Sequence, residues 1–319
     1  MTRRSVFWLI ARALFGTALL VYVLRKGGAW ASLRDLFGMA WLIVVINLVP
    51  IAGAVVEAFR LRVLFRAQNL DVPIPIGFRV VAIGALFNLW IPGGTGGDLM
   101  KLYYLAGRHK GQGVEVATIL LVDRVVALFA MLCLILGLLA LQMPALMHVP
   151  TVQGTALGVV VGLVALMTGV ALLWSSALRS SRLYRKALEW LPLGRHLSRA
   201  SDAAFAFRSR KRALLSASLL CLVGHIMLVG SLALTGSVLL PSVPSLLVCT
   251  LALLGLIASA IPITPGGIGV GETAAEALFR SVGVPGGAAV VTAWRAGMVL
   301  ISTVGALLYI VDVRSLRQS

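Results

Sequence analysis

Nine charged side chains of this 319-residue chain lie inside strongly apolar sequence or at its edges. They are Glu57, Arg60, Asp98, Lys101, Asp123, Arg124, Glu272, Glu276 and Arg295. A charge near the centre of a bilayer costs at least about 2.5–3.5 kcal/mol, so these groups must face protein, water or a ligand. Because a guanidinium binds a phosphate or a carboxylate through paired hydrogen bonds, the arginines are candidates for binding an anionic group.

Four of these residues belong to a pattern that occurs twice. The first copy is Pro92-Gly93-Gly94-Thr95-Gly96 with Asp98 and Arg124, and the second is Pro265-Gly266-Gly267-Ile268-Gly269 with Glu272 and Arg295. The two prolines are 173 residues apart, the two acids 174 and the two arginines 171. Hydrophobic segments that are broken by Gly and Pro at matching positions of two halves are typical of a transporter binding site.

Each motif predicts a break between two half-helices inside the membrane. Pro92 and Pro265 lack a backbone donor, and the glycines accept conformations that other residues avoid. The second half-helix begins with unpaired N–H groups and a positive dipole end, which favours an anion such as a lipid phosphate. Asp98 and Glu272 stand near this start, and we expect them to cap the helix, to bind a ligand or cation, or both.

The deep arginines have two interpretations. Arg124 and Arg295 lie too far inside predicted transmembrane helices for their side chains to reach the interface easily. In one interpretation they contact a substrate directly, as the motif glycines and Lys101 would. In the other they form internal ion pairs, Arg295 with Glu272, and Arg124 with Asp98 or Asp123.

The remaining charges group by helix face. Asp98 with Lys101 and Glu57 with Arg60 are three residues apart, and Glu272 with Glu276 four. Residues at these spacings are neighbours on a helix surface, so they can pair or couple to an ion. For Glu57 and Arg60 we favour a self-paired couple near the inner end of a span.

Motifs of enzymatic chemistry are absent from the sequence. It has no Ser-His-Asp pattern, HExxH, P-loop or GxSxG motif. The three cysteines and four histidines show no metal-ligand spacing, so we expect no metal, no cofactor and no enzymatic activity. His225 lies in an apolar span, where a packed, hydrogen-bonded histidine is commoner than a proton relay.

Composition indicates an integral membrane protein. The chain is 60% hydrophobic and 12% charged, and we expect one all-α polytopic membrane domain over residues 1–319. In a soluble protein the net charge of +17 would suggest nucleic-acid binding. Here the bases lie mostly between apolar runs, where they set topology and contact anionic lipid.

Apolar runs predict six full spans, at about 5–24, 38–59, 114–141, 154–176, 212–238 and 286–311. Two more apolar stretches, 76–91 and 244–263, end at the PGG motifs. Shorter and more polar stretches follow them, 97–108 and 270–282. Each pair predicts a re-entrant hairpin that enters the bilayer, turns at the glycines and returns.

Loop charge predicts the orientation. The loop 177–211 carries nine Lys and Arg residues, whereas 142–153 carries none. The positive-inside rule therefore places the first loop in the cytoplasm and the second outside. Both termini are then cytoplasmic, and we expect 178–212 to lie on anionic lipids of the inner leaflet.

This orientation makes the two hairpins open to opposite sides. We therefore predict an inverted-topology repeat. The first repeat is 1–150 with its hairpin at about 76–108, and the second is 151–319 with its hairpin at about 244–282.

The stretches around 84–130 and 255–300 also resemble a known family. IPGGTGGDLMKLYYLAGRHKGQGVEVATILLVDRVVALF, IPITPGGIGVGETAAEALFRSVGVP and AWRAGMVL are similar to the lysylphosphatidylglycerol synthase transmembrane-region family, flippase-like proteins with hopanoid-associated members among them. The matching positions are Pro92, Gly96, Asp98, Lys101, Asp123, Arg124, Pro265, Gly266, Gly267, Gly269, Glu272 and Arg295. The chain has Gly94 where the family often has a base, and Asp98 and Lys101 where Glu and Arg are usual. These departures suggest a less anionic head group.

The resemblance implies a bacterial inner-membrane protein that moves a lipid between leaflets. Family substrates range from aminoacylated phospholipids to polyprenyl-linked sugars, so we expect a flippase for a lipid with an anionic or glycosylated head group. The sequence stops after its last span, and we expect it not to make aminoacyl-lipid. One alternative is a non-transporting scaffold for a lipid-synthesis enzyme, and another is a membrane-embedded enzyme acting on lipid phosphates.

Overall fold

The computed structural model describes residues 39–90, 95–176, 194–261 and 263–318, together with positions 21, 22, 25 and 181. All regular elements of these residues are helices, as predicted. The helices are α3 (Ala40–Ala67), α4 (Ile74–Trp90), α5 (Gly96–Arg108), α6 (Gly113–Leu141), α7 (Met143–Leu146), α8 (Pro150–Trp174), α11 (Gly194–Ala206), the 3-10 turn η1 (Phe207–Ser209), α12 (Lys211–Leu239), α13 (Ser245–Ala258), α14 (Val270–Ser281), α15 (Gly287–Ala296) and α16 (Met298–Gln318).

Five segments are long and apolar enough to cross a bilayer: α3, α6, α8, α12 and the α15–α16 pair. They contain 25–29 residues each, and at 1.5 Å per residue this exceeds the ~30 Å of hydrocarbon in a bilayer. Helices also satisfy their own backbone hydrogen bonds, as a lipid environment requires. The chain is an all-α polytopic membrane protein. These segments match five of the six predicted spans, and the sixth, 5–24, lies outside the described residues.

The predicted span 286–311 is not one continuous helix. α15 ends at Ala296 and α16 begins at Met298, with Gly297 between them. A Cβ atom at Gly297 would lie 2.2 Å from the carbonyl oxygen of Ile46 on α3, which no side chain tolerates. The glycine therefore lets the last span approach the backbone of α3 closely at this break.

Two short apolar helices turn back where the PGG motifs predicted a break. α4 packs against α5, and α13 packs in the same way against α14. A Cβ at Gly97 would stand 2.9 Å from the Gly84 carbonyl oxygen, and one at Gly255 would stand 2.6 Å from the Cβ of Ala275. Small residues at these crossings therefore let each pair of helices approach closely.

The turn of the second hairpin has the backbone that its glycines predicted. Gly266, Gly267 and Gly269 have φ of 59°, 67° and 84°, in the region that glycine adopts without penalty. The corresponding turn of the first hairpin, with Pro92, Gly93 and Gly94, lies outside the described residues, while Gly96 opens α5.

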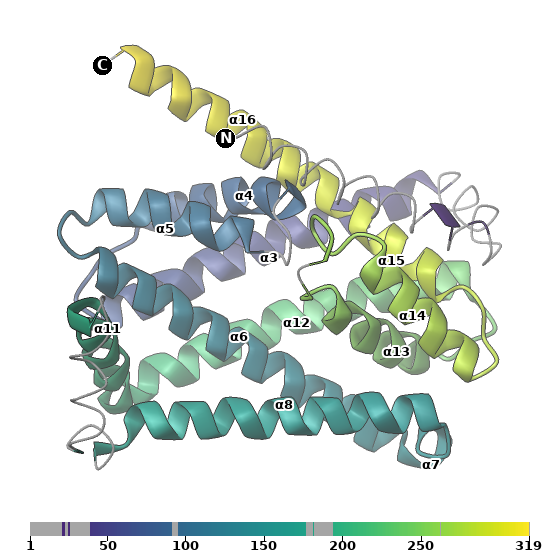
Figure 1. Ribbon diagram of the computed structural model, residues 1–319. Helices are drawn as coiled ribbons and strands as arrows, with labels where there is room; N and C mark the ends of the chain where they lie inside the picture. Colours follow the sequence, from purple (N-terminus) through teal and green to yellow (C-terminus); the bar gives the residue numbers. More distant parts are fainter. Residues whose placement is uncertain are drawn as a thin grey trace.

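The two hairpins extend inward from opposite ends of the molecule and meet near its centre (Figure 1). At the meeting point a Cβ on Gly266 would lie 3.3 Å from the carbonyl oxygen of Asn88, near the end of α4. The turn of the second hairpin therefore lies against the end of α4.

The loops sort by charge between the two ends. At one end Arg199 of α11, within the base-rich loop that was predicted to be cytoplasmic, pairs with Glu115 in the first turn of α6 at 2.7 Å. At the other end Gln142, within the loop that carries no Lys or Arg, donates to the carbonyl oxygen of Leu246 in the first turn of α13 at 3.3 Å. The predicted grouping of the loops thus agrees with the fold.

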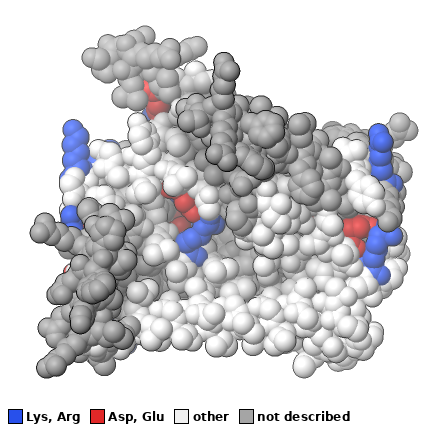
Figure 2. All heavy atoms as spheres, in the orientation of Figure 1, with Lys and Arg blue, Asp and Glu red and all other residues white. Residues whose placement is uncertain are grey.

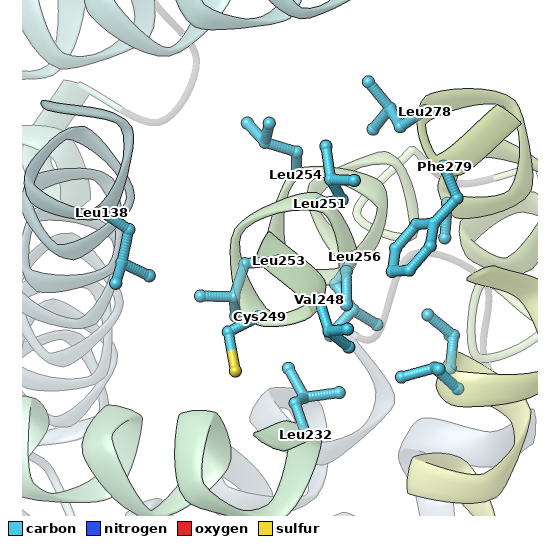
Figure 3. Packing of buried hydrophobic residues seen from close by; sticks show 14 of the residues in the cluster. Leu138, Leu232, Val248, Cys249, Leu251, Leu253, Leu254, Leu256, Leu278 and Phe279 are labelled. Atoms are coloured by element: carbon cyan, nitrogen blue, oxygen red, sulfur yellow. The ribbon is translucent and has the colours of Figure 1, made fainter. Parts of the chain in front are cut away.

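Corresponding helices of the two halves pack alike. α3 contacts α4 and α6, and α12 contacts α13 and α15. The halves also interlock, since α16 packs on α4, α6 packs on α13, and α3 packs along α12. α13 is buried on almost every side, with Leu253 and Cys249 facing α6 and α12 and with Phe279 of α14 close by (Figure 3).

Candidate functional site

Arg60 and Asp123 form the innermost ion pair of the first half. Arg60 Nε donates to one carboxylate oxygen of Asp123 at 2.5 Å, and Nη2 donates to the other at 2.9 Å. Nη1 contacts the Cys221 sulfur at 3.0 Å. Both charged side chains are almost fully buried, and this paired geometry supplies the compensation that a buried charge requires.

Two further pairs extend from Arg60 toward the first hairpin. Glu57 lies 3.7 Å from Arg60 Nη2 and accepts a short hydrogen bond from Lys101 Nζ of α5. Lys101 is itself 3.6 Å from Asp98. Glu57 and Arg60 are therefore paired as we favoured from the sequence, but each also has a closer partner on another helix.

Arg124 completes this chain of charges. Its Nη2 lies 2.7 Å from Asp98 Oδ2, so of the two partners considered from the sequence Asp98 has this pair, while Asp123 pairs with Arg60. We call the resulting series, in which each neighbour has the opposite sign, the charge chain. It runs Arg124, Asp98, Lys101, Glu57, Arg60, Asp123.

One end of the charge chain is accessible from outside. The Arg124 side chain is 52% exposed, and its neighbours one turn away on α6, Leu121 and Leu128, are exposed and apolar. In Figure 2 an acidic and a basic group lie side by side near the middle of the face, over the junction of α5 and α6, whereas the other charged groups lie toward its edges. This end of the chain therefore lies on a surface that a bilayer would cover.

The inner part of the charge chain lines a cavity. The cavity measures about 360 Å³, and Glu57, Arg60 and Lys101 are its charged residues. Most of its wall comes from α3 and α12. α3 contributes Val49, Pro50, Gly53, Ala54, Val56, Glu57 and Arg60, and α12 contributes Leu220, Cys221, Gly224, His225, Met227 and Leu228.

Apart from Arg60, these two sets of wall residues correspond one to one. Each α3 residue stands 171 positions before its α12 counterpart, the offset that also separates Arg124 from Arg295. The two helices are antiparallel, since the end of α3 and the start of α12 lie at the same end of the molecule (Figure 1). The cavity thus lies on the boundary between the halves and is built from equivalent positions of both.

The equivalent positions differ in charge. At an offset of 171, Glu57, Arg60 and Asp123 correspond to Leu228, Ser231 and Trp294. At 174, the offset of the motif acids, Lys101 corresponds to Ala275. Four of the six members of the charge chain therefore have no charged counterpart in the second half.

Arg295 is held by its own hairpin. It donates a short hydrogen bond to Glu272, and its other nitrogens donate to the carbonyl oxygens of Gly266 at 2.8 Å and Gly267 at 3.1 Å and to the Ser259 hydroxyl at 2.9 Å. Arg295 therefore forms the internal ion pair with Glu272 that was one of the two interpretations from the sequence. Arg295 fastens α15 to the second turn, and Pro265 at the start of that turn is buried.

The second-half carboxylates cap helices. Glu272 is fully buried and accepts from the Gly269 N–H at 2.8 Å, at the start of α14, as predicted. Glu276 accepts from the N–H groups of Gly286 at 3.2 Å and Ala288 at 3.1 Å, at the start of α15. The two glutamates therefore serve different helix starts rather than one shared site.

Two polar residues at the hairpins were not anticipated from the sequence. Asn88 Oδ1 accepts from the Gly97 N–H at 2.7 Å, so α4 supplies the contact at the start of α5 that we expected from Asp98. Ser259 binds Arg295 at the equivalent place of the second half. Asn88 and Ser259 are 171 residues apart, and this offset is the signal by which both could have been found.

The sequence model of one protein family, described as the lysylphosphatidylglycerol synthase TM region, matches residues 8–307. The chain belongs to this family. The match spans both hairpins, the charge chain and the cavity, and the family is one of membrane domains associated with flippase-like movement of lipids. No curated protein and no solved structure gave a match.

Among the described residues, no group of histidine, cysteine or acidic side chains is arranged to hold a metal ion. The interfacial stretch 178–212 is described only at 181 and from 194 onward. The lipid contact predicted for that stretch therefore remains a prediction.

Proposed function

We propose that this member of the lysylphosphatidylglycerol synthase TM region family is a transporter that moves the head group of a membrane lipid from one leaflet to the other. The head group is anionic or glycosylated. The observation that carries the proposal is the charge chain, which joins the lipid-facing Arg124 to Arg60 and Lys101 in the central cavity.

The position of Arg124 favours a charged lipid group as its ligand. A half-exposed guanidinium among apolar side chains at membrane depth is costly unless a ligand or water contacts it. A phosphate matches a guanidinium at least as well as a carboxylate does. An anionic head group can therefore replace Asp98 at Arg124, while Asp98 keeps Lys101 as a partner at 3.6 Å.

The alternating signs supply a route toward the cavity. Each base of the charge chain is a binding position for a phosphate, and each carboxylate is an acceptor for the hydroxyls of a sugar or glycerol. At about 360 Å³ the cavity lies at the small end of ligand pockets, which measure roughly 300–1,000 Å³. It holds a head group but not two acyl chains, so the chains stay in the bilayer.

The proposed setting is the inner membrane of a bacterium, with the base-rich end and both termini in the cytoplasm. Transport of this kind needs no covalent step, so we propose a transporter rather than an enzyme. The partners are the lipid substrate, anionic lipids at 178–212 and an enzyme of lipid synthesis that supplies the substrate.

Leaflet exchange in vesicles tests the proposal. Purified protein is reconstituted into liposomes that contain a trace of labelled phosphatidylglycerol, its lysyl ester, a polyprenyl phosphate, a glycosylated polyprenyl phosphate or phosphatidylcholine, and the fraction open to an impermeant quencher is followed over time. We expect at least one anionic or glycosylated lipid to exchange faster than in protein-free vesicles, with phosphatidylcholine unchanged. Exchange of none of them by folded protein would contradict transport and favour the scaffold alternative.

A further inference from the structure

The proposed transport raises a problem of charge balance. The charge chain has three carboxylates and three bases, so it is neutral without a ligand. A head group with one net negative charge makes the cavity region negative as it enters. Because uncompensated charge is costly in a low dielectric, a compensating positive charge must enter with the anion or form inside the cavity.

His225 is placed to supply that charge. It belongs to the α12 wall of the cavity, one turn beyond Cys221, whose sulfur contacts Arg60. Because α3 and α12 are antiparallel, the next turn of α12 faces the turn of α3 that carries Glu57. Histidine is the side chain whose ordinary titration range falls between about pH 5 and 8.

The ring of His225 also has an unused polar atom. Its Nδ1 is buried and makes no hydrogen bond among the described residues. The Cys221 carbonyl one turn earlier approaches the ring, but not in hydrogen-bond geometry. A buried polar atom without a partner is uncommon and calls for an explanation such as a ligand or a functional role.

The charged groups around the empty cavity balance one another, so no further positive charge is needed there before a ligand binds. The charged and titratable groups are Glu57 and Arg60 of α3, Lys101 of α5, Cys221 of α12 and, behind Arg60, Asp123 of α6. The other elements of the wall, α4, α15 and α16, contribute residues without a titrating group, such as Asn88, Trp294 and Met298. Arg60 and His225 line the same cavity, and because like charges repel, a bound anion favours a positive charge on the ring.

We propose that His225 is a proton-binding site that is charged when the anionic head group occupies the cavity, so that one proton crosses the membrane with each head group. This inference rests on the proposed function and names its coupling ion. One proton passes from water to the imidazole as the anion enters. The same proton returns to water on the other side when the anion leaves.

Proton uptake on lipid binding tests this without requiring transport. Phosphatidylglycerol in detergent is titrated into the full-length protein at about pH 7, by calorimetry in two buffers of different ionisation enthalpy, which gives the protons taken up per bound lipid. We expect about one for the wild type and close to none for His225→Gln. His148→Gln is the matched control, because His148 is an exposed histidine at the base-free end, and it should behave as the wild type.

Two results would overturn the proton site: binding by the wild type without proton uptake, or unchanged uptake in His225→Gln. If the variant does not fold, the wild-type buffer comparison still decides whether a proton is bound. The pH dependence of wild-type leaflet exchange then tests coupling, with the rate expected to fall about tenfold per pH unit above the titration range of the imidazole. Exchange that is independent of pH would refute coupling and leave transport intact, whereas proton uptake without any exchange would refute transport alone.

Discussion

Arg124 and Arg295 occupy equivalent positions of the two halves but have different surroundings. Arg295 is 19% exposed, and a fully buried glutamate and the carbonyl groups of the second turn surround it. Arg124 is 52% exposed, and its pair with Asp98 is continuous with Lys101 and Glu57. We infer that the two equivalent arginines have different roles: Arg295 holds the second hairpin in place, and Arg124 contacts the substrate.

Replacing Arg295 should mainly reduce stability. Arg295→Gln leaves Glu272 buried without a charged partner, and breaking a buried ion pair costs about 3–5 kcal/mol. The apparent midpoint of thermal unfolding in detergent should therefore fall markedly. Arg66→Gln is the control, because Arg66 pairs with Asp71 at 3.0 Å on the surface, where a pair contributes about 0–1 kcal/mol. Equal midpoints for the two variants would contradict the holding role of Arg295.

The sequence identified the charged residues of the site and most of their pairs, but not the two pairs that α3 makes with α5 and α6. Glu272 as a cap follows from its place three residues after Gly269, which is local information. The pair of Arg60 with Asp123 joins positions 63 residues apart, and it depends on the rotation of two helices about their axes. Local spacing predicted the pair of Glu57 and Arg60, which the structure has at 3.7 Å, but it does not specify that rotation and so did not reveal their partners on other helices.

At the scale of elements, glycine contacts set how closely the helices pack. α16 lies against α4 with Gly305 at the crossing, where a Cβ would stand 1.9 Å from the Ala82 carbonyl oxygen. This contact joins the last helix of the second half to the first hairpin. It is therefore one of the places where the halves are locked together.

Gly305→Ala should disturb this crossing. The added methyl group meets backbone rather than a movable side chain, so α16 must shift away from α4, at an overpacking cost of about 1–3 kcal/mol. Gly169→Ala on α8 is the matched control, since nothing lies within 4 Å of its Cβ position and alanine favours a helix. A crosslink between α4 and α16 should form less readily in the first variant only. Equal crosslinking and stability in both variants would show that the crossing tolerates a side chain.

The helix pairs α4–α5 and α13–α14 lie where the hairpins were predicted, because the signals for them are local. A Pro-Gly-Gly break that follows a short apolar run is enough to predict α13, its turn and α14. The break between α15 and α16 at Gly297 was missed because its signal is not local. Its cause is the Ile46 carbonyl of a distant helix, and an isolated glycine inside an apolar run does not reveal such a neighbour.

At the scale of the whole molecule, the two halves interlock around one cavity. The one-to-one offset between its two walls explains why the cavity lies at their boundary, where transporters built from inverted repeats bind substrate. The two walls differ in charge: the first half contributes Glu57 and Arg60, whereas the equivalent positions of the second half, Leu228 and Ser231, are uncharged. The sequence revealed the repeat but not the cavity, because the cavity requires α3 and α12 to face each other.

The opposite openings of the hairpins can be tested by labelling. Lys110→Cys at the end of the first hairpin and Pro285→Cys at the end of the second are exposed positions at opposite ends, placed in protein whose three native cysteines have been replaced. In intact cells an impermeant thiol reagent should label Pro285→Cys, and it should label Lys110→Cys only after the membrane is opened. Labelling of both from the same side would rule out the inverted arrangement.

The measurement that tests the account most directly compares two arginine variants in the vesicle exchange assay. Arg124→Gln and Arg199→Gln each remove an arginine that is about half exposed, 52% and 51%, and paired to a carboxylate at 2.7 Å. Arg124 begins the charge chain, whereas Arg199 lies at the end of the molecule. We predict that Arg124→Gln loses most of the lipid exchange, by about tenfold or more if it removes one charge-assisted contact of ~1.5–3 kcal/mol, and that Arg199→Gln keeps the wild-type rate. Wild-type exchange by folded Arg124→Gln protein would contradict the claim that the charge chain carries the head group.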